Sequence, residues 1–137
     1  LENAGTAVEG MVIALSWHRN EDNPSEFEQE AQRLWGEDIY LQTAMGYDAT
    51  QVVIEGLKVL EQQQNNLSRQ GLKQALSSPN FSAKGATGKV EFEPSGDRKL
   101  FTGIGVLVQV QPDPESETGY KYELLQQPNR DSTINND

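Results

Sequence analysis

In the stretch from Phe81 to Asp97, FSAKGATGKVEFEPSGD, the hydropathy alternates with a period of two from Gly85 onward. Val90 and Phe92 point to one side of an extended strand, and the charged residues around them point to the other. The segment from Pro94 to Asp97 has Pro and Gly at the positions that favour a chain reversal. We therefore predict a hairpin strand at Lys89–Glu93, followed by a turn.

The segment from Gly85 to Gly88 within this stretch has the glycine content of a phosphate-binding loop. Such a loop holds its anion where it leads into the first turn of a helix. Here the segment leads into a strand, so the sequence favours a turn over an anion site.

A second, longer strand is predicted downstream, where Ile104, Val106, Val108 and Val110 alternate with other residues. Gly103 and Gly105 flank Ile104, and they indicate a bend or a bulge at the start of this strand. Weak strand character extends from Tyr120 to Leu125, and residues 128–137 are predicted to form a frayed tail.

Three helices are predicted upstream of the hairpin. The first begins at Asn23-Pro24-Ser25-Glu26, with Asn23 as the cap, and ends at Gly36. Its apolar stripe comprises Phe27, Ala31, Leu34 and Trp35.

The second helix runs from about Gln42 to Gln62, and Ser68 caps a third, short helix that ends at Ser77-Ser78-Pro79. We expect the second helix to place Asp48 on its polar face. Its predicted core face comprises Met45, Ala49, Val52, Val53, Leu57 and Leu60.

The first predicted strand is the unbroken apolar run from Met11 to Leu15, which follows Gly10. Because polar residues do not alternate with the apolar ones, the run predicts a strand covered on both faces, as in a parallel sheet. Strands and helices in this order place the chain in the α/β class.

Composition limits the classes of partner. The chain of 137 residues carries 21 acidic and 11 basic residues, for a net charge of −10. This charge is repelled by phosphate backbones and anionic lipid, so we expect neither nucleic acid nor a membrane surface as partner. No apolar run approaches the roughly 20 residues of a membrane helix, so no membrane insertion is expected. No secretion signal is visible, and the start at Leu1 instead of Met hints at a longer protein.

Side chains for catalysis are scarce. His18 is the one histidine, and no nucleophile or metal partner is near it in sequence, so an ordinary loop histidine is favoured over a ligand contact by roughly four to one. Glu21 and Asp22 precede a helix start, where acidic groups suit the helix dipole better than catalysis. The chain has no cysteine. We therefore expect no enzyme activity, no cofactor and no metal site.

Three motifs resemble those of the type I periplasmic solute-binding proteins, in particular the branched-chain amino acid and receptor ligand-binding group. The segment Ala44–Ala49 resembles the family's Ala-x-Gly-Tyr-Asp-Ala opening of a long helix. Ser68–Leu76 resembles its short helix, and Phe81–Asp97 resembles its Phe-x-Gly-x-Thr-Gly-x-Val-x-Phe signature, which is the most specific of the three. The resemblance covers Gly10 to about Val110 in the family's order.

The resemblance implies a two-lobed fold with Rossmann-like lobes, of which this chain is the C-terminal portion. Residues 1–16 then end the second lobe, 17–22 cross a hinge, and 23–100 form first-lobe helices and the hairpin. Residues 101–112 cross back as a strand, and 113–137 form the end of the second lobe and a polar tail.

Four residues are candidate ligand contacts. By the resemblance, Gln42 takes a position where family members often have an aromatic residue that faces the ligand, and this departure puts an all-aliphatic ligand in doubt. Trp17 and His18 lie in the loop after the first strand, and Tyr40 lies in the connection before the long helix.

The resemblance implies a periplasmic or extracellular receptor that delivers an amino acid, branched-chain or more polar, to the permease of an ABC transporter. The alternative is the extracellular sensor domain of a signalling receptor with the same fold, and a third possibility is a fragment of a Rossmann-type enzyme. Because part of the fold lies outside this chain, we expect either self-association or a complex with the N-terminal part. We also expect the chain alone to bind no amino acid with useful affinity.

Overall fold

The structure is a computed structural model that describes residues 2–36, 39–64, 67–100 and 105–126. It has the mixed helix and strand content that the sequence predicts. The elements in chain order are a 3-10 helix at Glu2–Val8, β1 at Val12–Leu15, α1 at Glu26–Trp35, α2 at Leu41–Gln62, α3 at Arg69–Leu76, β2 at Ala83–Gly85, β3 at Gly88–Val90, β4 at Val106–Pro112 and β5 at Tyr120–Gln126.

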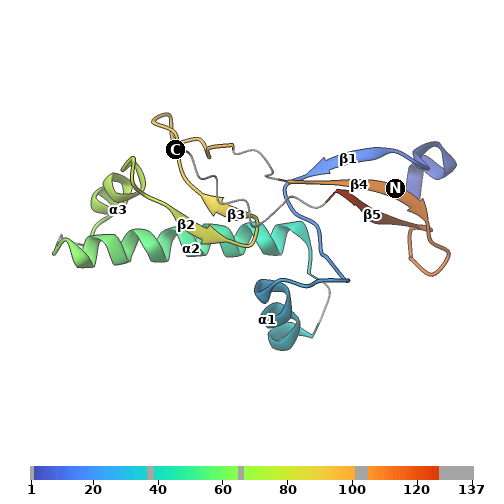
Figure 1. Ribbon diagram of the computed structural model, residues 1–137, viewed down its shortest axis with the longest axis horizontal. Helices are drawn as coiled ribbons and strands as arrows, with labels where there is room; N and C mark the ends of the chain where they lie inside the picture. The colour runs from blue at the N-terminus through green and yellow to red at the C-terminus, as the bar shows by residue number, and fades with distance from the viewer. Residues whose placement is uncertain (1, 37–38, 65–66, 101–104, 127–137) are drawn as a thin grey trace, which may run out of the picture.

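These elements pack in two main groups (Figure 1). The strands β1, β4 and β5 form an antiparallel sheet in the order β1-β4-β5. Helix α2 packs against α3 and against β2, which forms a separate two-stranded hairpin with β3. Within the described residues, the hairpin therefore lies in a different sheet from β1 and β4.

The environment of β1 differs from the prediction. It pairs with β4 antiparallel, with Ile13 opposite Val108, and within the described residues it lies at an edge of the sheet. Its side chains alternate between exposed and half-buried, and Val12 is 50% exposed. An unbroken apolar run identifies a strand but does not tell whether both of its faces are covered.

Strand β4 is the centre of the sheet, as its alternation predicts. Val106, Val108 and Val110 are buried on one side of the strand. Gly105 enters the strand with φ of +94°, and a Cβ there would lie 2.8 Å from the Leu15 carbonyl oxygen, so the close approach of the two chains requires glycine. Ile104 and Gly103, and the predicted tail at 128–137, lie outside the described residues.

Helix α1 begins two residues later than predicted, because Ser25 and not Asn23 is its cap. The Ser25 side chain accepts a hydrogen bond from the backbone of Glu28, and the Glu28 carboxylate accepts one from the backbone N–H of Ser25, which is a capping box. Gly36 ends the helix in the left-handed conformation, as predicted. Of the predicted stripe, Ala31 is buried and Phe27 half-buried, whereas Leu34 and Trp35 are exposed.

Helix α2 lies where the sequence predicts it, but its buried face differs from the predicted one. The buried residues follow each other at intervals of four. Val52 and Leu60 are among them, as expected, but Asp48 is buried, and Met45, Val53 and Leu57 are exposed. Asp48 can be buried because hydrogen bonds satisfy its carboxylate, so the apolar pattern alone misplaces the core face by one residue. The buried residues are Ala44, Asp48, Val52, Gly56 and Leu60.

The hairpin packs on α2 through apolar side chains. Val90 and Phe81 are buried with Val52, and Phe92 stacks on Phe81 with ring centroids 6.1 Å apart. Val90 and Phe92 therefore both join this core, as the alternation predicts, and the turn at 94–97 is present. Helix α3 is capped by Ser68 and ends at Leu76, also as predicted.

Candidate ligand-binding site

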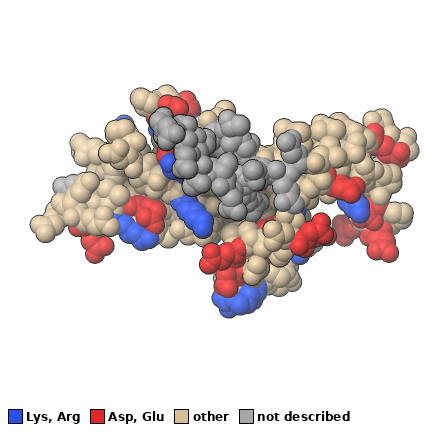
Figure 2. Space-filling view, viewed as in Figure 1, with Lys and Arg blue, Asp and Glu red and all other residues tan. Residues whose placement is uncertain are grey.

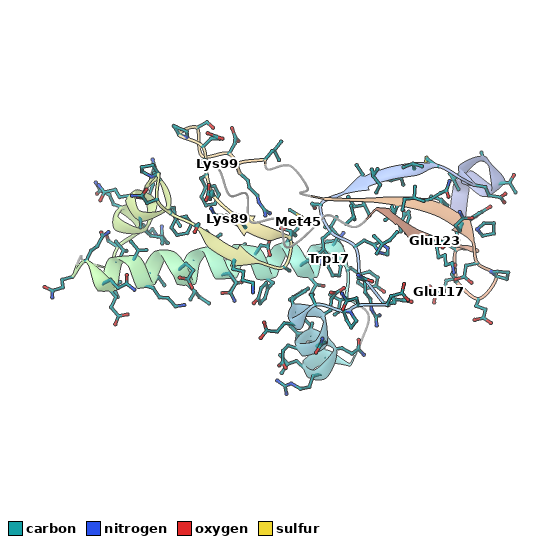
Figure 3. The ribbon with its side chains drawn as sticks, viewed as in Figure 1. Trp17, Met45, Lys89, Lys99, Glu117 and Glu123 are labelled. Carbon is teal, nitrogen blue, oxygen red and sulfur yellow. The ribbon has the colours of Figure 1, made fainter. Side chains whose placement is uncertain are left out.

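Trp17 connects the end of β1 to the first turns of α2. Its side chain is 3% exposed and packs in one cluster with Ala31, Ile39 and Ala44. The Trp17 and Phe27 rings meet edge to face, with centroids 6.0 Å apart. Figure 3 shows Trp17 near the same end of α2 as Met45, on the side of α2 that is nearer to the sheet. The buried Trp17 Nε1 has no hydrogen-bond partner among the described residues.

The loop after Trp17 is built on the buried carboxylate of Glu28. One Glu28 oxygen accepts the N–H of Asn20 at 2.7 Å, and the other accepts the N–H of Ser25 at 2.6 Å. The Asn20 side chain is also buried, and its oxygen accepts the N–H of Asn23. The prediction from sequence missed this role of Glu28, although the Ser-x-x-Glu spacing from Ser25 is the signal that would have found it.

His18, in the same loop, contacts the sheet and not the α2 cluster. Its ring meets the Tyr122 ring of β5 edge to face, with centroids 6.1 Å apart. The His18 Nδ1 donates to the Arg19 carbonyl oxygen at 2.8 Å, because a carbonyl can only accept. The loop from Trp17 to Asn20 therefore contacts both groups of elements.

Tyr40 and Gln42 lie at the start of α2, and both are exposed. Tyr40 is the N-cap residue, and its side chain makes no capping hydrogen bond. The first turn of this 22-residue helix holds no acidic side chain, so the positive end of its dipole is not neutralised within the helix. This end of α2 favours an anionic group of a bound molecule.

The structure thus brings Trp17 close to the start of α2, where Tyr40 and Gln42 are also found. It holds Trp17 and His18 in packing contacts with other rings, and it leaves Tyr40 and Gln42 open. Whether these four residues contact a ligand stays a prediction.

Asp48 near this end of α2 accepts several hydrogen bonds, and the prediction from sequence placed it on the wrong face. One carboxylate oxygen accepts the N–H groups of Ala86 and Thr87, in the turn between β2 and β3. The other accepts the Thr87 hydroxyl and pairs with the Arg98 guanidinium at 3.4 Å.

The Gly85–Gly88 segment therefore wraps around a carboxylate that belongs to the chain itself. A Cβ at Gly85 would lie 2.3 Å from Asp48 Oδ1, so only glycine permits this contact. The preference for a turn over a phosphate loop is confirmed, since the segment joins β2 to β3.

Among the described residues, the charged side chains other than Asp48 and Glu28 are at least partly exposed. Acidic side chains gather over α1 and over the end of the sheet far from α2 (Figure 2). On the hairpin, Glu91 pairs with Lys89 and with Lys99, and the hydrogen bond from Lys89 is the main reason that the pKa of the Glu91 carboxyl lies below its ordinary value. These pairs are typical of a solvated surface and do not form a reaction centre.

Within residues 2–36, 39–64, 67–100 and 105–126, no group of three or more His, Asp or Glu side chains is placed to hold a metal ion. None of the helices in the same ranges combines the length and the apolar character that crossing a membrane requires.

No protein-family model matches this chain, and no curated protein matches its sequence. Among solved structures, the crystal structure of LivK, a leucine-binding protein from Thermotoga maritima, is similar to it with a TM-score of 0.53 and 21% sequence identity. The similarity covers 87% of this chain and 31% of LivK, so the chain spans under a third of the length of that protein. By this likeness the chain has the α/β fold of the type I periplasmic binding proteins, over an extent consistent with the C-terminal portion of that fold.

Proposed function

We propose that this chain is part of a solute-binding protein whose ligand is an amino acid or a closely related small molecule. The observation that carries the proposal is the structural likeness to the leucine-binding LivK over 87% of the chain. The role is binding and not catalysis, which agrees with the scarcity of catalytic side chains in the sequence.

The proposed ligand site lies beside the start of α2. Trp17 is buried against Ile39 and Ala44 and so fixes the start of α2, and Tyr40 and Gln42 offer exposed polar groups there. The first turn of α2 holds no acidic side chain, so the positive end of the helix dipole suits the carboxylate of an amino acid. Gln42 at this place favours a ligand with some polar character over a purely aliphatic one.

In this proposal residues 17–22 are the hinge between two lobes. The loop contacts the α2 group through Trp17 and the sheet through His18, and these contacts support the proposal. We propose a periplasmic or extracellular location and delivery of the ligand to the permease of an ABC transporter. An extracellular sensor domain of a signalling receptor is the second candidate, and adjacent permease and ATPase genes would separate the two.

The test is ligand-induced stabilisation of the full-length product of the gene that encodes this chain. We expect one or more of the common amino acids to raise its free energy of unfolding by about 2.7 kcal/mol at a ligand concentration of 100 times Kd, because the ligand binds the folded state only. Thermal melting with each amino acid in turn measures this shift, and common sugars serve as control ligands. A product that no amino acid stabilises would refute the proposed ligand class.

A further inference from the structure

The loop between β1 and α1 connects the two groups of elements. Among the described elements, the substantial contacts fall within the β1-β4-β5 sheet or within the group formed by α2, α3 and the hairpin. The loop leaves the sheet at the end of β1 and runs to α1 (Figure 1). Its side chains therefore influence how one group can move relative to the other.

Trp17 belongs to the helical side of this loop. Its ring packs in one cluster with Ala31 of α1 and Ala44 of α2. The Phe27 ring of α1 meets the Trp17 ring with centroids 6.0 Å apart and the Tyr47 ring of α2 with centroids 4.8 Å apart. Buried side chains that interlock in this way resist separate movement. Trp17, α1 and the start of α2 therefore form one rigid unit.

The buried carboxylate of Glu28 attaches the rest of the loop to this unit. One Glu28 oxygen accepts the N–H of Asn20 at 2.7 Å, and the other accepts both the N–H and the hydroxyl of Ser25. We call these bonds from Asn20 and Ser25 the loop clamp. Breaking the loop clamp is costly, because Glu28 is 2% exposed and its carboxylate would lose its donors away from water. The segment from Asn20 to Ser25 therefore has little freedom relative to α1.

Ser16 is the position that remains free to bend on this side. Leu15 before it is paired with Val106 in the sheet, and Trp17 after it is packed among the helices. Gly105 lies beside it on the segment that enters β4. A Cβ at Gly105 would lie 2.8 Å from the Leu15 carbonyl oxygen and 4.0 Å from Ser16 Cα. The φ of Gly105 is +94°, a value that glycine adopts without strain, so the backbone can rotate where the two segments meet.

We propose that Glu28 is a positioning residue for closure on the ligand, and that the loop clamp confines the bending between the two groups to Ser16 beside Gly105. The contact between the His18 and Tyr122 rings spans the two groups, and a single edge-to-face contact is weak enough to break when they move. This inference rests on the proposed function, because it assumes that two lobes close on an amino acid.

Hydrogen exchange in the full-length gene product tests the loop clamp without a ligand. Glu28→Ala removes both acceptor oxygens, and we expect the backbone amides of Asn20 and Ser25 to exchange at least about tenfold faster. Ser25→Ala is the matched control, because it breaks the same capping box but leaves the bond from Asn20 to Glu28. In this control the Asn20 amide should exchange within about twofold of the wild-type rate.

A second variant covers the case in which Glu28→Ala does not fold. Glu28→Gln keeps the volume of the side chain and one acceptor oxygen, so one of the two backbone amides loses its acceptor. We expect exchange of the Asn20 or the Ser25 amide to rise by at least about threefold in this variant.

Amino-acid binding tests the consequence for the ligand site. The probe is the common amino acid that most raises the melting temperature of the wild-type full-length product. We expect Glu28→Ala to raise its Kd about tenfold, because a looser loop leaves fewer molecules in the orientation that closes on the ligand. Ser25→Ala should change Kd by no more than about twofold. Calorimetry at a temperature at which every variant is folded measures Kd, so a loss of stability alone does not alter it.

Exchange measured with and without this amino acid locates the bending. We expect the ligand to change the exchange of residues 15–16 and 105–106 and to leave that of residues 20–25 unchanged. A ligand-induced change throughout residues 20–25 would place the bending inside the loop and overturn the role of the loop clamp.

Two further results would overturn the proposal. One is unchanged exchange of the Asn20 and Ser25 amides in Glu28→Ala, which would show that Glu28 does not hold the loop. The other is an equal Kd, or an equal rise in Kd, in Glu28→Ala and Ser25→Ala, because the bond to Asn20 would then have no effect of its own. If no amino acid binds the wild-type product, the proposed function fails, whereas exchange in Glu28→Ala still decides whether Glu28 holds the loop.

Discussion

Replacing Asp48 with Ala is expected to lower the free energy of unfolding by about 3 kcal/mol, because the variant leaves a turn and a guanidinium without their shared acceptor. The Asp48 side chain is buried, and its carboxylate accepts from Ala86, from Thr87 and from Arg98. Arg98 is partly exposed, so water compensates for some of the lost pairing, and for this reason the expected cost lies at the lower end for a buried ion pair. Urea denaturation of the chain, followed by circular dichroism, measures the loss.

The matched control for this change is Asp97→Ala. The Asp97 side chain is exposed and accepts from the neighbouring Ser95 hydroxyl at 2.9 Å. We expect its removal to change the free energy of unfolding by no more than about 0.5 kcal/mol. Equal losses from the two substitutions would show that the Asp48 contact does not hold the hairpin on α2.

Gly85→Ala is expected to cost about 2–3 kcal/mol, because the new methyl group would overlap the Asp48 carboxylate. The built Cβ lies 2.3–2.7 Å from the carboxylate atoms, so either the turn or the helix must move. Chemical denaturation again measures the effect. Gly46→Ala is the control, since the open space at this helical position should let alanine stabilise the chain by about 1 kcal/mol.

Combining Gly85→Ala with Asp48→Ala separates this overlap from other effects of the glycine. If the methyl group acts through the carboxylate, its cost should fall by more than about 1 kcal/mol once the carboxylate is gone. Additive losses in this double-mutant cycle would mean that Gly85 matters for its backbone conformation and not for its contact with Asp48.

The elements of this fold could be predicted from sequence because each carries a local signal. The period of two in β4 gives the buried Val106, Val108 and Val110, and Ser68 marks the start of α3. Gly36 ends α1 at the position that its backbone freedom predicts. These signals involve residues within about one turn of helix or a few residues of strand, so no tertiary information is needed.

The core face of α2 could not be predicted in the same way, because it depends on a contact between distant parts of the chain. Asp48 can be buried because the backbone N–H of Ala86, in a turn 38 residues later, donates a hydrogen bond to its carboxylate. Hydropathy places a carboxylate in water unless the partner is known. Glu28 differs from Asp48, because its bond from the Ser25 N–H follows the local Ser-x-x-Glu spacing and its other bond comes from Asn20, only eight residues earlier.

The candidate site was only partly predictable for a related reason. The sequence indicates that Trp17 lies in a connection, but not that it packs against Ile39 and Ala44 at the start of α2. The environment of β1 depends on which segments lie beside it, and its apolar run does not specify them.

We infer that this chain supplies one part of a solute-binding fold and that the ligand site needs the rest. Isothermal titration calorimetry tests it most directly, with the common amino acids titrated into the 137-residue chain and into the full-length gene product. We predict saturable heat for at least one amino acid with the full-length product and no heat above dilution with the chain alone, because half of an enclosing site leaves the charged ends of the ligand unpaired. Saturable micromolar binding by the isolated chain, or no binding by the full-length product, would contradict the claim.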